Sequence, residues 1–206
     1  MKVLIGTTNV SKRERFSVLL ADKKVEIVTP EQCGIKNEPE ESGKTPEENA
    51  CLKAAFYGQY FDIVICNDSG LYFKELPIDD PRQPGLNIRT PMGKKRLSDE
   101  EMISYYTGLI RTLGGKVEAF YLDGVAVLCN KQLYTYMDQE SALQKSFYMV
   151  DTPSEKRREG WPLDSLSISK KTGRYFVDRR DSESDNIVAD EYRDRLRAFL
   201  CNALNL

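Results

Sequence analysis

The sequence contains no histidine among its 206 residues. This absence excludes Ser-His-Asp triads, Cys-His dyads, zinc sites of the HExxH type and imidazole bases. An enzyme of this composition has to work with carboxylates, lysines, arginines and a hard cation held by oxygen ligands. Any catalytic chemistry is therefore expected in the acidic and basic side chains.

Cysteine is sparse, and no two cysteines form a CxxC pair. The five cysteines are Cys33, Cys51, Cys66, Cys129 and Cys201. An odd number at such wide spacings fits neither a disulfide framework nor a zinc ribbon. We expect reduced and mostly buried thiols, and with them a cytoplasmic location.

Long hydrophobic runs are also missing, since the apolar stretches have the length of strands and fall far short of the ~20 residues that span a bilayer. The opening MKVLIGTT has one lysine and a very short apolar run, so we expect a first strand there and no signal peptide. The formal net charge is -2 and provides no basic field for nucleic acid. We predict a soluble protein that binds neither membranes nor nucleic acid.

What the sequence does contain is an alternation of short apolar runs and helical patterns. Strands are predicted at 3–5, 25–28, 62–65, 117–129 and 132–137, and helices at 11–22, 45–61, 98–113 and 188–204. The second helix has the clearest start: Thr45 suits the N-cap, Pro46 the first helical position, and Glu48 completes a capping box. The order of elements predicts one α/β domain over residues 1–206.

The stretch ICNDSGLYFKEL places Asp68 directly after a buried strand. Asp, Ser and Gly are ordinary turn residues, so a plain turn is one interpretation. The other is a metal or catalytic carboxylate, because the acidic loop with Glu41 leads into the helix that precedes this strand. The two carboxylates could then meet at one edge of the sheet and bind Mg²⁺. The alternative for each acid is a solvated charge on a loop.

Three further features suit a phosphate ligand or a base. GTTNVSK is a strand-loop-helix junction with Lys12 in the first helical turn, which suits an anion or is a plain helix cap. Lys53 lies among apolar helix neighbours, where it could reach a phosphate or extend to solvent. Trp161 could stack on a ligand or fill the core.

Four motifs in these stretches occur in the order and spacing of a known family. TTNVSK, EESGKTPEENACLKA, NDSGL and PGLNIR resemble the T-x-N-x-x-K, E-x-G-x-T-F-x-E-N-A-x-x-K-A, D-D-S-G-L and P-G-x-x-S-A-R motifs of the inosine triphosphate pyrophosphatases. The resemblance covers the first 90 residues well. Beyond them, GWPLD resembles the family's G-F-G-Y-D, and EYR its terminal S-H-R.

The resemblance implies an elongated α/β fold, with a mixed sheet, flanking helices and two lobes around a central cleft, that forms a homodimer. It also implies Mg²⁺-dependent hydrolysis of a nucleoside triphosphate to monophosphate and pyrophosphate. Asp68 would bind metal and activate water, and Glu41 would be a second metal ligand. The remaining substrate-binding residues would be Thr8, Asn9, Lys12, Lys53, Ser69, Trp161, Asp164, Tyr192 and Arg193.

Several positions depart from the family pattern, among them Pro162 and Leu163, which replace a glycine and an aromatic in the base-binding loop. Asn67 replaces the first acid of the D-D pair, and Arg15 occupies the usual position of a glutamate. Tyr192 stands in place of a histidine, and Ile187 lies near the position of a base-reading lysine. The phosphate half of the motif set is thus retained while the base-reading half is rewritten. Two alternatives stay open: a pyrophosphatase with another base preference, and a pseudoenzyme that binds nucleotide or a protein partner without turnover.

Overall fold

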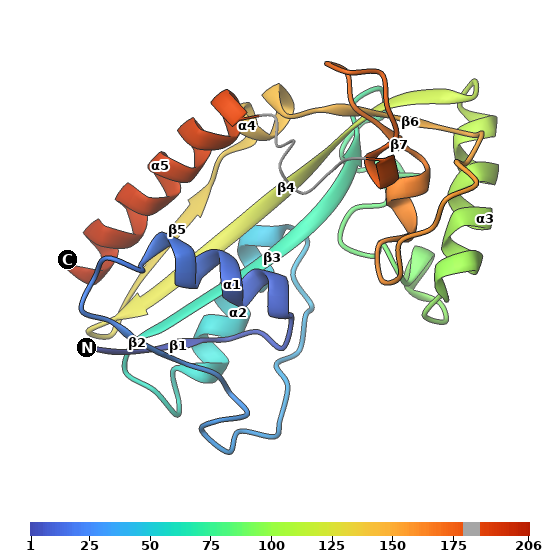
Figure 1. Ribbon diagram of the computed structural model, residues 1–206. Helices are drawn as coiled ribbons and strands as arrows, with labels where there is room; N and C mark the ends of the chain where they lie inside the picture. Colours follow the sequence, from blue (N-terminus) through green and yellow to red (C-terminus); the bar gives the residue numbers. More distant parts are fainter. Residues whose placement is uncertain (179–185) are drawn as a thin grey trace. The chain divides into compact units, whose positions relative to one another are not determined.

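The computed structural model describes residues 1–178 and 186–206, without the side chains of Ser11, Met92 and residues 186–190. The described chain forms two compact units (Figure 1). Unit 1 comprises Met1–Ser69, Leu122–Asp138 and Asp190–Leu206, and unit 2 comprises Gly70–Tyr121 and Gln139–Ala189. The single domain over residues 1–206, the elongated form and the central cleft remain predictions.

The elements follow the order β1 (Lys2–Ile5), α1 (Val10–Leu19), β2 (Glu26–Val28), α2 (Pro46–Tyr57), β3 (Val64–Phe73), η1 (Pro91–Gly93), α3 (Asp99–Thr112), β4 (Lys116–Cys129), β5 (Gln132–Met137), α4 (Gln139–Gln144), β6 (Phe147–Val150), η2 (Pro162–Ser165), β7 (Ser167–Ile168), η3 (Phe176–Asp178) and α5 (Asn186–Leu204). The strand order is β2-β1-β3-β4-β6-β7, with β5 paired to β4. β1 is parallel to β2 and β3, whereas β4 is antiparallel to β5 and β6. The predicted α/β class with a mixed sheet and flanking helices is confirmed.

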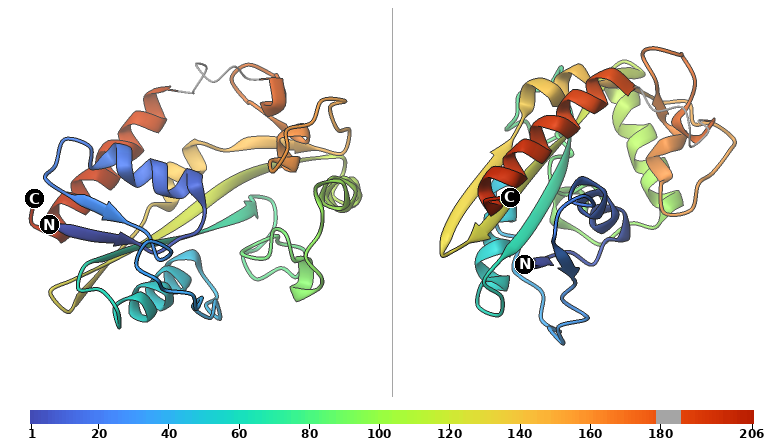
Figure 2. Two further views of the ribbon diagram at one scale, coloured as in Figure 1. Left: turned by 60° about the horizontal axis from the view of Figure 1, so that its bottom comes forward. Right: turned by 60° about the vertical axis from the view of Figure 1, so that its left-hand side comes forward.

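In unit 1 the strands bury both of their faces. Successive side chains of a strand point to opposite sides. Ile5 and Ile65 accordingly pack with residues of α1 and α5, while Leu4 and Cys66 pack with residues of α2. Figure 2 shows α1 and α5 on one side of these strands and α2 on the other. The site described below uses both of these faces.

The start of α2 is largely as predicted. The Thr45 side chain accepts a hydrogen bond from the Glu48 N–H, and Pro46 takes the first helical position. The Glu48 carboxylate, however, accepts from the Lys44 N–H, so only half of the capping box forms. The helix also ends at Tyr57, earlier than predicted, because Gly58 is a poor helix former and residues 58–60 form a turn.

The close approach of α2 to β4 depends on Gly124. A Cβ atom at this position would lie 2.2 Å from the Glu47 backbone nitrogen and 2.3 Å from the Pro46 carbonyl carbon. Only a residue without a side chain lets two backbones come this near to each other. Gly124 thereby allows the first turn of α2 to pack directly on the strand.

Strand β3 differs from the prediction in a way that matters for the site. Asp68-Ser69-Gly70 was expected to break the strand predicted at 62–65, but β3 begins at Val64 and continues to Phe73. Asp68 therefore lies inside the strand and not at its end. The turn preference of Asp-Ser-Gly is outweighed because Asp68 and Ser69 each find partners on opposite faces of the sheet.

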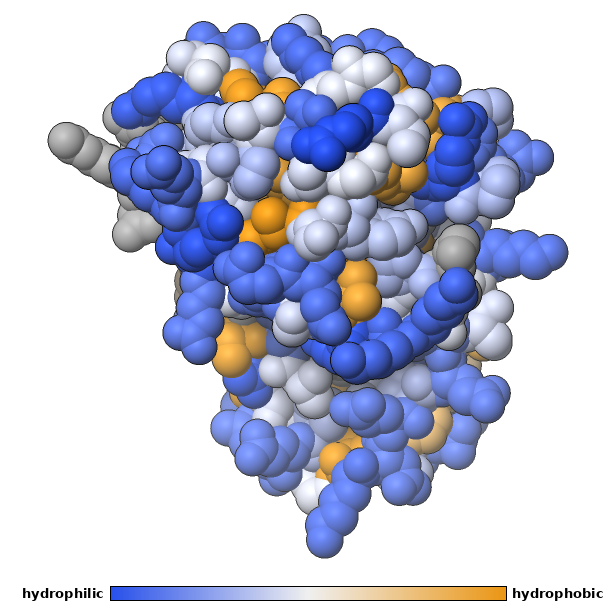
Figure 3. Space-filling model, turned by 90° about the vertical axis from the view of Figure 1, so that its right-hand side faces the viewer, coloured by the Kyte–Doolittle hydropathy of each residue, from blue (hydrophilic) through white to orange (hydrophobic). Residues whose placement is uncertain are grey.

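Unit 2 has its own apolar core, formed by α3, by β6 and by the parts of β3 and β4 within this unit. The capping box of Ser98 and Glu101 at the start of α3 is present in full. β6 pairs with β4 and not with β5, the strand that precedes it in the chain. In Figure 3 polar residues dominate the face shown, with hydrophobic residues scattered among them in small groups. Within residues 1–178 and 186–206, no helix is both long and apolar enough to span a membrane.

Candidate active site

Asp68 is the centre of a buried polar cluster in unit 1. Its carboxylate accepts a hydrogen bond from the Asn49 side-chain amide at 2.8 Å and one from the Lys53 ammonium at 3.2 Å. The Lys12 ammonium lies 3.7 Å from the same carboxylate. Asp68 is only 8% exposed, so its charge is balanced by these groups and not by bulk water.

Lys53 connects the two carboxylates that were predicted to bind metal. Its ammonium lies 2.8 Å from Glu41 and 3.2 Å from Asp68. Burial alone would lower the pKa of Lys53, but the two carboxylates outweigh it and raise the pKa. Glu41 and Asp68 thus contact a single cation, which here is the side chain of a lysine.

The loop before α1 contributes the next predicted residues. Thr8 and Asn9 are exposed, and the Asn9 side chain accepts from the Lys12 N–H as the N-cap of α1. The Lys12 side chain reaches back to Asp68. Burial lowers the pKa of Lys12 even though the Asp68 carboxylate opposes this shift. A helix start, two ammonium groups and two carboxylates therefore converge in unit 1.

A second polar cluster lies on the opposite face of β3. The Ser69 hydroxyl donates to Asp123 at 2.5 Å, and Arg15 donates to the other oxygen of Asp123 at 2.8 Å. Arg15 also donates to the Tyr192 hydroxyl at 2.8 Å, and its guanidinium lies 5.4 Å from the centre of the Tyr192 ring. Four side chains from α1, β3, β4 and α5 are joined in this way.

Asp123 is ionised in this cluster. Burial would raise the pKa of Asp123, but the Arg15 charge and the hydrogen bond from Ser69 outweigh that effect and lower the pKa. Burial also raises the pKa of the Tyr192 phenol. Arg15 thus occupies the family's glutamate position and has a carboxylate of this chain as its partner.

Asn67 is buried in β3 without a partner. It is 1% exposed, and within the described part of the chain neither atom of its side-chain amide has a hydrogen bond. Leaving such a group unsatisfied costs ~1–3 kcal/mol of stability. An asparagine at position 67, where the family has an acid, therefore reduces the buried negative charge next to Asp68 but leaves an amide without hydrogen bonds.

Replacing Asn67 with leucine is expected to raise the free energy of unfolding by about 1–3 kcal/mol, because an apolar side chain of similar shape removes the unsatisfied amide. Urea unfolding of wild type and variant measures this change. Asn49→Leu is the matched control: Asn49 is equally buried but bonds Asp68 and the Gly43 N–H, so its loss should lower stability. A lower stability of Asn67→Leu would show that the amide is satisfied in solution.

Two predicted base-binding residues belong to unit 2. Trp161 is 48% exposed and does not fill the core, and the Arg158 guanidinium lies 5.4 Å from its ring centre. The Asp164 carboxylate accepts from the same arginine at 3.4 Å. In unit 1, Arg193 is exposed and Tyr192 is half-buried. The side chain of Ile187 lies outside the described residues.

Sequence reasoning missed three residues of these clusters as site residues. Asn49 lay inside a quoted motif but was not assigned a role, and Arg15 was noted only as a departure. Asp123 was not singled out, although it is a lone carboxylate within the apolar strand FYLDGVAV. A single acid among strand residues that are otherwise buried is a usable signal, because such a group needs a partner.

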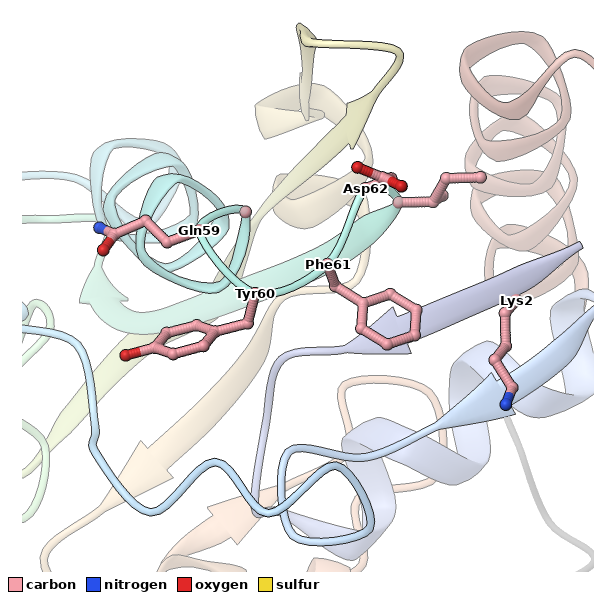
Figure 4. Close-up of a pocket in the computed structure, with 7 residues that line it drawn as sticks. Lys2, Gln59, Tyr60, Phe61 and Asp62 are labelled. Carbon is pink, nitrogen blue, oxygen red and sulfur yellow. The ribbon is translucent and has the colours of Figure 1, made fainter.

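A separate hollow of about 500 Å³ lies at the other end of α2. It is lined by Lys2 and residues 58–63. Figure 4 shows Gln59, Tyr60, Phe61 and Asp62 on the loop that joins α2 to β3, and Lys2 on β1. This set of residues is distinct from the Asp68 cluster, so the hollow is not the candidate site.

The Asp68 cluster is suited to anionic substrates that carry a hard cation. Lys12 and Lys53 supply positive charge for phosphate oxygens, and Glu41 and Asp68 supply oxygen ligands of the kind that Mg²⁺ prefers. Among residues 1–178 and 186–206, no group of three or more acidic or cysteine side chains could hold a metal by itself. Mg²⁺ commonly needs only one or two carboxylates besides water and substrate phosphates. The donor set therefore fits this ion.

Comparisons with known proteins relate the chain to one family. Residues 3–139 match the model of the Ham1 family. A dITP/XTP pyrophosphatase of Thermoanaerobacter pseudethanolicus is 42% identical over 77 residues, which are 37% of this chain and 39% of that protein. One of Caldanaerobacter subterraneus is 28% identical over 138 residues, which cover 61% and 68% of the two chains. The match thus spans about two fifths of the first relative's length.

Solved structures share the fold along nearly the whole chain. The Ham1 protein of Staphylococcus aureus superposes with a TM-score of 0.74 at 20% identity, covering 98% of this chain and 99% of that one. A HAM1 protein of Coxiella burnetii gives the same TM-score and coverage at 18% identity. Identities this low establish the fold and not the chemistry.

Proposed function

We propose a function for this chain, which belongs to the Ham1 family. The chain hydrolyses nucleoside triphosphates to the monophosphate and pyrophosphate. The observation that carries the proposal is the Asp68 cluster, in which two lysines and an asparagine surround one buried carboxylate. The names of the curated relatives support it, because they describe pyrophosphatases of dITP and XTP.

In the proposed reaction a water oxygen forms a bond to the α-phosphorus, and the bond from this phosphorus to the bridging oxygen breaks. Asp68 accepts the proton of the water, and pyrophosphate leaves. Lys12 and Lys53 hold phosphate oxygens, with help from Thr8 and Asn9 at the start of α1. Lys53 can turn from the carboxylates towards a phosphate because its ammonium has three protons.

Mg²⁺ is part of the proposal, with Glu41 and Asp68 as its ligands. When bound, the ion supplies positive charge that stabilises the phosphates as negative charge develops on the leaving group. Both carboxylates already contact one cation, Lys53, so the arrangement accommodates positive charge between them. The homodimer and the cytoplasmic location remain predictions.

The base preference is proposed to be weak. Trp161 is exposed and can stack on any base, while Asp164 already pairs with Arg158. The Tyr192 hydroxyl is held by Arg15, so it is poorly placed to read a base. Arg193 then remains the main cationic donor for a 6-oxo purine. Discrimination between ITP and ATP should accordingly be smaller than a full set of fixed donors would give.

Pyrophosphate release from ITP, XTP, GTP, ATP, UTP and TTP with Mg²⁺ tests these statements. We expect release from several bases, with kcat/KM for ITP exceeding that for ATP by less than ~100-fold, and with this ratio falling in Arg193→Ala. A strong preference for ITP that survives the loss of Arg193 would place recognition of the oxo group elsewhere.

The same panel separates the alternatives. Turnover of pyrimidine nucleotides only would favour a pyrophosphatase with another base preference. Tight nucleotide binding without any release of pyrophosphate would favour the pseudoenzyme. This alternative is motivated by Asn67, which replaces the first acid of the D-D pair. Measuring binding and release on one protein preparation distinguishes these outcomes.

A further inference from the structure

The direction of the hydrogen bond between Ser69 and Asp123 follows from the chemistry of the two groups. An ionised carboxylate can only accept, and a serine hydroxyl has a single proton to donate. With Asp123 ionised, the bond of 2.5 Å between them must be donated by Ser69. The Ser69 oxygen then has only lone pairs left for any other partner.

Arg15 determines the role of the second carboxylate oxygen of Asp123, the one that does not bond Ser69. Its guanidinium donates to Asp123 at 2.8 Å and to the Tyr192 hydroxyl at 2.8 Å, and it stays charged throughout the physiological range. The atom of residue 123 that faces Arg15 therefore has to be an acceptor. The Tyr192 hydroxyl also donates to this oxygen, at 3.5 Å. Because every one of these contacts makes Asp123 an acceptor, the proton between Asp123 and Ser69 belongs to Ser69.

A triphosphate oxygen is also an acceptor. The resemblance to known motifs assigned Ser69 to the phosphates, but two acceptors facing each other repel. Ser69 follows Asp68 directly in β3, but its side chain lies on the opposite face of the strand from the Asp68 carboxylate. Its lone pairs are suited to a hydroxyl donor and not to phosphate.

We propose that Asp123 is a positioning residue that makes Ser69 a hydrogen-bond acceptor, so that Ser69 binds a hydroxyl donor of the substrate complex instead of a phosphate oxygen. The donor is a sugar hydroxyl of the nucleotide, because the attacking water belongs to Asp68 on the other face of β3. The inference rests on the proposed function, because it takes the ligand to be a nucleoside triphosphate.

Asp123→Asn reverses the polarity of Ser69. The amide oxygen turns to Arg15, which can only donate, and the amide N–H₂ then faces the Ser69 oxygen. Ser69 becomes an acceptor from residue 123, and its proton points towards the ligand. A ligand hydroxyl then faces a donor where it had an acceptor and loses its hydrogen bond to Ser69, whereas a phosphate oxygen would gain one.

The test is the Kd of an ITP analogue with a methylene bridge between the α and β phosphorus, measured by calorimetry with Mg²⁺. Asp123→Asn and Ser69→Ala should each weaken binding about tenfold. Asp123→Asn should have almost no further effect when Ser69 is already alanine. A merely structural role of Asp123 would instead cost the same affinity in both backgrounds, and that result would overturn the proposal.

Tighter or unchanged binding by Asp123→Asn would also overturn it, because Ser69 would then donate to phosphate. Asp138→Asn is the matched control: Asp138 accepts from Tyr136 and Arg195 in the same unit and is not part of the Ser69 cluster, so its loss should leave the Kd unchanged. If Asp123→Asn does not fold, Asp123→Ser replaces it, since a hydroxyl can accept from Arg15 and donate to Ser69.

Inorganic triphosphate tests whether the donor belongs to the sugar. Asp123→Asn should leave the Kd of this ligand unchanged, because it has no sugar hydroxyl, and a weakening of both ligands would overturn the proposal. The readout does not depend on turnover. A wild-type protein that binds the analogue but releases no pyrophosphate from ITP would contradict the proposed activity alone, while the Kd values would still decide the role of Asp123.

Discussion

Asp68→Asn is expected to lower the rate of pyrophosphate release from ITP by about 10²- to 10⁴-fold, the usual effect of losing a positioned general base. Asparagine keeps the size of the side chain but cannot accept the proton of the attacking water. It also removes one of the two carboxylates proposed to hold Mg²⁺. The kcat with saturating Mg²⁺ and ITP measures the change.

The matched control for this variant is Asp22→Asn, which removes an exposed carboxylate that pairs with Arg197 on the surface of unit 1. Its kcat should equal that of wild type. Circular dichroism of Asp68→Asn confirms that the variant is folded before its rate is interpreted. If Asp68→Asn kept wild-type turnover, the base would have to be another residue and the proposed mechanism would be wrong.

Lys53→Met is expected to lower the free energy of unfolding by about 3 kcal/mol, because removing one partner of a buried ion pair is costly. The Asp68 carboxylate then keeps only the more distant Lys12 ammonium and the Asn49 amide. The pair with Asp68 carries this effect, since both side chains are almost fully buried. The pair with Glu41 contributes little, because the Glu41 side chain is half exposed. Urea unfolding without metal measures the loss.

A second variant tests this explanation of the loss. Combining Lys53→Met with Asp68→Asn removes the buried negative charge of residue 68, so the double variant should be more stable than Lys53→Met alone. Mg²⁺ should stabilise Lys53→Met more than wild type, because the carboxylates of Glu41 and Asp68 are then free of the competing ammonium. A double variant that is less stable than Lys53→Met would refute the role of the buried charge, and equal stabilisation by Mg²⁺ would refute the shared metal site.

The family was recognisable from four motifs because their residues lie close together in the sequence. The cap of α2 at Thr45 and the β4–β5 turn at Asn130-Lys131 were predictable for the same reason. Both turn residues have positive φ angles, of 51° and 64°, as tight hairpins require. Local signals thus sufficed for most of the elements and for three of the residues around Asp68, namely Lys12, Glu41 and Lys53.

The second cluster could not be predicted in this way. Arg15 and Asp123 are 108 positions apart in the sequence, and neither belongs to a motif that names the other. Nothing in an amino-acid pattern states that a helix of the N-terminal third will meet a strand of the second half at this one position. The continuation of β3 past Asp68 was missed for a related reason, because its turn-prone residues are held by partners distant in sequence.

Gly124 has a consequence for any survey of mutational tolerance in this chain. It has no functional group, yet every side chain at this position collides with the backbone at Glu47 and must displace the first turn of α2. Asn49 and Lys53 would move with that turn, away from Asp68. In a saturation scan selected for activity, Gly124 should therefore tolerate as few substitutions as Asp68. In a scan selected only for expression, Gly124 should tolerate fewer substitutions than Asp68.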